Sequence, residues 1–197
     1  MLIPIVMVVY LNSIASQQFE AGNFEQAEET CQLALAYEPE GPARAMILGN
    51  LASAERALGR NAAAEDLANR AIALLEKTEG TATVLLVPGL NTLSAVYIDT
   101  QRYDEAEAVL KQAIRLGSHD AGAHYATSLH NLGAVYHLRG KLDRAAELYD
   151  RALRIRLQLF GPEDPRTRAT ARNIVTLDQA STRLARAAKS KPENSPR

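Results

Sequence analysis

The chain has 197 residues and an almost neutral formal charge of −1, from 22 basic and 23 acidic side chains. Hydrophobic residues make up 47% of the chain, which is ample for the core of a globular protein. Cys31 is the single cysteine, so an internal disulfide and a cysteine-ligated metal cluster are excluded.

The first predicted element is an apolar run at the amino terminus, MLIPIVMVVYL. It is too short to cross a bilayer. Small residues at Ser13 and Ala15 resemble a signal-peptidase site, but no lysine or arginine precedes the run. We therefore expect residues 1–10 to be retained as the start of a helix, in a cytoplasmic protein. If residues 1–15 acted as a signal peptide, the protein would instead be exported.

A pattern of small and large residues then recurs four times, at offsets of 37, 42 and 39 residues. The copies are Ser13–Tyr37, Asn50–Leu74, Leu90–Ile114 and Leu129–Ile155. A half-copy begins at Pro165 and places Asn173 42 residues beyond Asn131. In the fourth copy the pattern consists of Leu132, Gly133, Tyr136, Gly140, Ala145, Tyr149 and Ala152.

Each copy predicts two helices joined by a short turn. The turns are expected at Gly22, Gly59, Gln101 and Gly140, because glycine readily takes the left-handed backbone conformation that ends a helix. Alanine and glycine are expected where the two helices cross closely, with large side chains interlocking around them. One such hairpin cannot bury its apolar face alone, so the copies should stack.

This pattern resembles the tetratricopeptide repeat, and its longer offsets resemble the kinesin light chain subgroup, with units of roughly 42 residues. The resemblance implies an all-α solenoid of antiparallel helix pairs wound into a right-handed superhelix. The second copy departs from the pattern, since Glu55 replaces the tyrosine, Asn61 a large residue and Ala68 a larger one. We expect looser helix pairing there.

The resemblance also sets the expected boundaries. We predict a solenoid over residues 8–185, with repeats near 8–41, 45–78, 87–120 and 126–159 and a capping helix over 165–185. Residues 187–197, AAKSKPENSPR, are polar and predict a disordered tail. Pro88 lies near the start of the third copy and predicts a helix that begins there or is kinked there.

The first helices of such a solenoid would form a concave wall, and an asparagine recurs on it in each copy. The candidate groove residues are Asn12, Asn50, Asn91, His130, Asn131, His137, Arg172 and Asn173. The resemblance implies that these amides bind the backbone of an extended peptide, because an amide offers both a donor and an acceptor. The alternative, that the amides bond neighbouring helices or water, stays open.

Other chemistry finds little support in the sequence. His119, His124, His130 and His137 lack the spacing of helical metal ligands, and no Gly-rich phosphate loop or Gly-x-Ser-x-Gly elbow is present. Only Arg56 and Arg172 approach the positions that a carboxylate clamp fills with lysine and arginine. We therefore predict no enzyme activity, no metal and no cofactor.

Charge is uneven along the chain: residues 1–80 carry −6, residues 81–128 carry −2 and residues 129–197 carry +7. An elongated molecule with an acidic and a basic end fits this gradient, and so do solvated helix faces. The basic part contains Arg144, Arg151, Arg154, Arg156, Arg166, Arg168 and Arg172. Because no aromatic residues interleave with them, we assign most to a solvated outer face and expect no nucleic-acid partner.

The sequence thus predicts a non-catalytic scaffold that binds a protein or peptide in its concave groove. The alternative is a structural or assembly subunit, or a self-associating solenoid, with no free peptide ligand. The sequence identifies neither the partner nor the oligomeric state.

Overall fold

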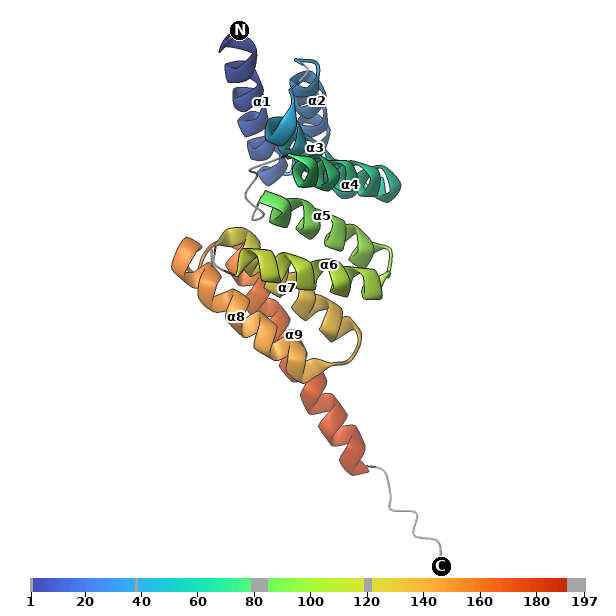
Figure 1. Ribbon diagram of the computed structural model, residues 1–197. Helices are drawn as coiled ribbons and strands as arrows, with labels where there is room; N and C mark the ends of the chain where they lie inside the picture. Colours follow the sequence, from blue (N-terminus) through green and yellow to red (C-terminus); the bar gives the residue numbers. More distant parts are fainter. Residues whose placement is uncertain (1, 38, 79–84, 119–121, 191–197) are drawn as a thin grey trace, which may run out of the picture. The chain divides into compact units, whose positions relative to one another are not determined.

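The computed structural model describes residues 2–37, 39–78, 85–118 and 122–190, and its regular elements are α-helices (Figure 1). The helices are α1 (Leu2–Glu20), α2 (Phe24–Leu35), α3 (Gly41–Ala57), α4 (Asn61–Lys77), α5 (Leu86–Asp99), α6 (Tyr103–Gly117), α7 (Ala123–Leu138), α8 (Leu142–Phe160) and α9 (Pro165–Ser190). No strand occurs in the described ranges, so the all-α class predicted from the sequence is confirmed.

The chain divides into two compact units, Met1–Asp120 and Ala121–Arg197. In the first unit α1 pairs with α2, α3 with α4 and α5 with α6, while α2 packs on α3 and α4 packs on α5. In the second unit α7 pairs with α8, and α9 packs on α8. Each unit is therefore built from helix pairs that stack in chain order.

The turn inside each pair lies where the sequence predicted it. Gly22, Gly59 and Gly140 have φ angles of 81°, 78° and 70°, in the left-handed region. Gln101 occupies the equivalent position of the third pair with φ of 60°, and among the described residues it is the one non-glycine with a positive φ. These four turns fix the register between the copies.

Small residues lie where the helices of a pair cross. In the second unit, a Cβ atom added to Gly133 of α7 would lie 2.9 Å from Cδ1 of Tyr149 in α8. Ala145 and Ala152 on α8 are fully buried. Small side chains at these positions allow the two backbones to approach and the Tyr149 ring to fill the space between them.

The apolar amino-terminal run is part of α1, and one side of it lies in the core. Val8, Leu11 and Ala15 are buried against residues of α2 and α3. Those residues are Cys31, Ala34, Ile47 and Leu51. Burial raises the pKa of the Cys31 thiol to about 12. None of the helices in the described ranges has the length and hydrophobicity of a membrane span.

The second pair contains the residues that depart from the repeat pattern. Glu55 is only 7% exposed, and its carboxylate oxygens lie 3.2 and 3.3 Å from Nη1 of Arg60. Arg60 also donates to Glu28 of α2 at 2.9 Å. The charge buried at the tyrosine position is therefore paired. Asn61 Oδ1 is buried without a hydrogen-bond partner, and the looser pairing expected here stays a prediction.

Two helix ends bear on expectations from the sequence. Helix α5 begins at Leu86, so Pro88 lies in its first turn, where a missing N–H breaks no helical hydrogen bond. Helix α9 runs to Ser190 and so includes residues 187–190 of the predicted tail, because alanine and lysine are good helix formers. Residues 79–84 and the rest of that tail, 191–197, lie outside the described residues.

Candidate peptide-binding surface

In the first unit, polar side chains link the first helix of one pair to the first helix of the next. Asn50 of α3 donates through Nδ2 to Oδ1 of Asn12 at 2.9 Å and to Oγ of Ser16 at 3.0 Å. Both acceptors lie on α1. The two candidate asparagines are therefore in direct contact and partly exposed.

The same kind of contact continues from α3 to α5. The hydroxyls of Ser53 and Thr92 lie 3.1 Å apart. One turn further along, Arg56 forms an ion pair with Asp99 at 2.7 Å, with about a third of each side chain exposed. We call the row Asn12, Ser16, Asn50, Ser53 and Thr92 the polar seam of the first unit.

Asn91 departs from the expected arrangement. Its side chain is only 6% exposed and interacts within the protein, so it does not join the seam. The offset of 42 residues from Asn50 leads to Thr92, and one residue along a helix rotates a side chain by about 100°. Asn91 as a groove residue is therefore corrected to Thr92.

In the second unit, three candidate residues gather around Tyr149. His130 of α7 lies with Nε2 3.4 Å from Nδ2 of Asn173 on α9, and Asn173 donates to the Tyr149 hydroxyl at 3.5 Å. The ring of His137 meets the Tyr149 ring edge-on, with 6.5 Å between centroids. Asn131 is partly exposed and has interactions of its own, and Arg172 is exposed.

The His130 imidazole is neutral at pH 7. Burial and the nearby charge of Arg156 lower the pKa of His130 to about 4. Since the Asn173 amide donates toward Nε2, the ring proton belongs on Nδ1, which lies 3.1 Å from Oγ1 of Thr170. His130 thus bridges α7 and α9 as both acceptor and donor.

Arg156 of α8 is a buried cation that the sequence analysis grouped with the outer-face arginines. It is 5% exposed and donates to the Arg166 carbonyl at 2.9 Å, to Thr170 at 2.6 Å and to Thr127 at 3.3 Å. Burial lowers its pKa to about 10, so it stays charged at pH 7. Its acceptors come from α7 and α9, and no local sequence signal marks that convergence.

The described residues contain no group of three side chains suited to hold a metal ion. What the two units offer is a set of amides, hydroxyls and one neutral imidazole on successive first helices. Such groups can form hydrogen bonds with a polypeptide backbone.

Stacked helix pairs, left-handed turns at fixed spacing and polar first helices define a helical repeat protein. The profile of the tetratricopeptide repeat matches residues 6–77, 81–158 and 124–190, and the chain belongs to this family. Its relatives and structural neighbours give it the kinesin light chain-like type. This is the fold of a protein-interaction scaffold, in a family that is generally non-enzymatic.

Two curated relatives come from Arabidopsis thaliana. The protein Kinesin light chain-related 2 is 33% identical over 117 residues, which are 55% of this chain and 18% of that protein. Kinesin light chain-related 1 is 29% identical over 101 residues, 49% of this chain and 17% of that protein. The chain thus spans less than a fifth of the length of these relatives.

Solved structures share the fold at lower identity. BtubC (BKLC) from P. vanneervenii has a TM-score of 0.64 and 21% identity, covering 99% of this chain and 87% of that one. A kinesin light chain-type protein of nearly identical TPR-like repeats from Podosopora anserina has a TM-score of 0.66 and 20% identity, covering 92% and 90%. These likenesses establish the repeat fold.

Proposed function

We propose that this chain binds a segment of a partner protein in an extended conformation along its first helices. The observation that carries the proposal is the polar seam of the first unit, which crosses three successive first helices. Within the seam, Nδ2 of Asn50 and Oδ1 of Asn12 bond each other. Oδ1 of Asn50 can then accept from a peptide N–H, and Nδ2 of Asn12 can donate to a peptide carbonyl.

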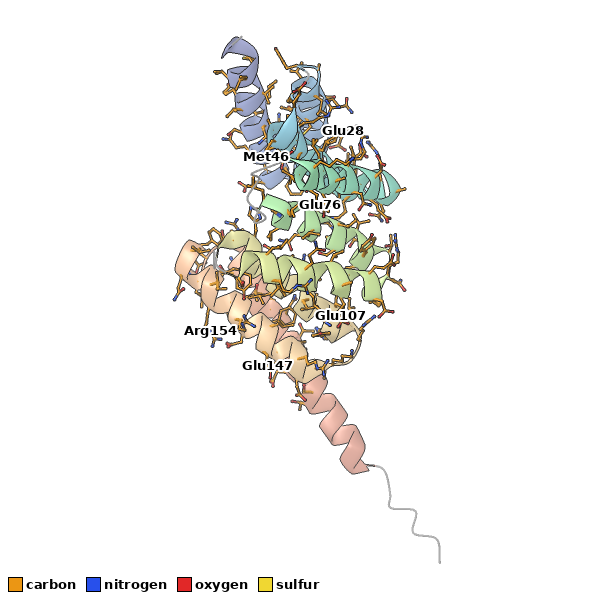
Figure 2. All side chains as sticks on the ribbon, viewed as in Figure 1. Glu28, Met46, Glu76, Glu107, Glu147 and Arg154 are labelled. Carbon is orange, nitrogen blue, oxygen red and sulfur yellow. The ribbon has the colours of Figure 1, made fainter. Side chains whose placement is uncertain are left out.

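Apolar side chains lie next to the seam on the same helices. Val9 of α1 is 63% exposed, and Met46 of α3, labelled in Figure 2, is 54% exposed. They occupy equivalent positions, 13 residues before the left-handed turns at Gly22 and Gly59. Gly49, one turn from Met46, has open space beside it. We expect these positions to contact nonpolar side chains of the bound segment, while the seam bonds its backbone.

The test compares affinity and stability in one variant. Asn50→Ala should weaken binding of a peptide selected from a random library by roughly 3- to 10-fold, the equivalent of one net hydrogen bond. Affinity is measured by fluorescence anisotropy and stability by thermal unfolding. Because Asn50 also links α1 to α3, its melting temperature will fall slightly.

A control separates recognition from support of the fold. Ser53→Ala removes a hydroxyl of the same seam, while Arg172→Ala removes an exposed side chain of α9 in the second unit. Loss of affinity in Asn50→Ala and Ser53→Ala, with Arg172→Ala unchanged, supports binding along the first unit. A lower melting temperature with unchanged affinity in both seam variants would mean that the seam only joins helices.

The proposal includes a cytoplasmic location with residues 1–15 retained. Its support is that Val8, Leu11 and Ala15 belong to the core of the first unit, so cleavage after Ala15 would remove part of that core. The amino-terminal sequence of the protein isolated from its source cells would decide this point.

A structural or assembly role is the second candidate. It is favoured by an exposed apolar face on α1, whose partner is considered next.

A further inference from the structure

Helix α1 exposes four large hydrophobic side chains on one broad face. Ile5, Val6, Val9 and Tyr10 are 60%, 62%, 63% and 59% exposed. The first charged residue of the chain is Glu20, at the end of α1. A contiguous apolar face without charge is a common mark of an interaction surface.

The register between the copies identifies what kind of face this is. Tyr10 precedes its left-handed turn residue by 12 positions, as Ile47 of α3 and Gly89 of α5 precede theirs. Ile47 is fully buried in the core that contains Cys31 of α2. A Cβ atom on Gly89 would lie 3.1 Å from Ile72 of α4. On α3 and α5 this position therefore packs on the second helix of the preceding pair.

A second position on the same side of the helix agrees. Gln17 of α1 precedes its turn residue by 5 positions, like Ala54 of α3 and Val96 of α5. Ala54 and Val96 are fully buried, whereas Gln17 is exposed. Tyr10 and Gln17 are thus stacking residues, and the exposed side of α1 continues the interface that joins one repeat to the next.

The chemistry of the face favours an identical face as its partner. Two uncharged α1 surfaces can approach each other without like-charge repulsion. Contact with α9 of another copy would instead bring Arg168, Arg172 and Asp178 against apolar side chains, because all three are exposed on that helix. Burying unpaired charge is costly, so contact between two α1 helices is preferred over a contact from α1 to α9.

We propose that the protein forms a homodimer in which Val6 and Tyr10 of α1 pack against the same residues of a second copy. The contact is isologous, with one two-fold axis, and it closes on itself instead of growing into a filament. Tyr10 lies two residues, or about 200°, from Asn12 around the helix, so the dimer face and the polar seam lie on different sides of α1. Dimerisation is therefore independent of peptide binding.

Sedimentation equilibrium across a concentration series tests the proposal. The wild-type chain should fit a monomer–dimer equilibrium with a dissociation constant on the order of micromolar, as expected for a small interface. Tyr10→Glu should weaken the dimer at least 10-fold, because it places two carboxylates in an apolar contact. The matched control is Leu33→Glu, since Leu33 on α2 of the same unit is 53% exposed and lies off the proposed contact.

Oxidative cross-linking gives a second readout. Tyr10→Cys should form a disulfide-linked dimer, whereas Leu33→Cys should not, and Cys31 is too buried to compete. A wild-type mass that stays monomeric up to roughly 100 µM, well above such a dissociation constant, would overturn the proposal. Equal weakening by Leu33→Glu, or a mass that grows beyond the dimer, would overturn it as well.

Discussion

Two glycines inside helices, Gly49 and Gly133, have opposite surroundings. Beside Gly49 of α3 no atom lies within 4 Å of the place where a Cβ would be, whereas beside Gly133 of α7 the Tyr149 ring lies at 2.9 Å. The same residue type is therefore a helix-weakening residue in one place and a packing requirement in the other.

Alanine substitution should separate the two roles. Gly49→Ala is expected to stabilise the protein by about 0.5 to 1 kcal/mol, because alanine loses less backbone entropy in a helix. Gly133→Ala is expected to destabilise it by about 1 to 3 kcal/mol through overpacking against Tyr149. Urea unfolding of the two variants measures both values, and a change of the same sign in both would contradict this account.

His130 gives stability a defined dependence on pH. Its pKa is about 4 in the folded protein, against an ordinary value of 6.5. Between these values the unfolded chain binds more protons than the folded one, so stability falls as the pH is lowered from 6.5 toward 4. At 1.36 kcal/mol per pKa unit, the full loss is about 2 to 3 kcal/mol.

The variant His130→Asn keeps a neutral polar side chain and removes this titration. We expect the difference in melting temperature between pH 7.5 and pH 5 to be smaller in the variant than in the wild type. Carboxylates that titrate nearby contribute equally to both proteins and cancel in the comparison. A variant with an unchanged pH response would show that His130 does not control it.

At the level of elements, basic residues just after the turns join each helix pair to the one before. Arg60 pairs with Glu28 of α2, labelled in Figure 2, and Arg102 pairs with Glu65 of α4 at 2.6 Å. Arg102 also lies 4.3 Å above the Tyr97 ring and pairs with Glu105. The same position in two successive pairs thus supplies a link between neighbouring repeats.

A charge swap tests whether this link orders the repeats. Arg102→Glu should lower the melting temperature by placing a like charge against Glu65, and the double variant Arg102→Glu with Glu65→Arg should recover part of the loss. Because the groups are exposed, the effect should shrink as salt is raised. No recovery in the double variant would show that the two side chains are not coupled.

The sequence predicted the helix pairs and their turns because these depend on local signals. Glycine at Gly22, Gly59 and Gly140 marks a helix end by its own backbone freedom, and alanine spacing marks the crossing helices. Seam membership was harder to predict, since a shift of one residue exchanges Thr92 for Asn91. Arg156 could not be placed, because its burial depends on Thr127 and Thr170 converging from two other helices.

For the whole molecule, the two outermost helices differ in chemistry. Helix α1 presents apolar side chains at about 60% exposure, whereas α9 presents exposed charged residues such as Arg168 and Asp178. Terminal repeats of a solenoid usually carry a polar outer face. By this criterion α9 closes the second unit against water, and α1 leaves the first unit with a face that can accept another helix.

The buried Cys31 thiol makes the protein a ready substrate for site-directed labelling. With a pKa of about 12 it has almost no thiolate at pH 7, so maleimide dyes will leave it unmodified. A cysteine introduced on any exposed helix face would then be the one reactive site in the folded chain. Fluorophores placed in this way, without first removing the native cysteine, would report on distances between chosen repeats in the native protein.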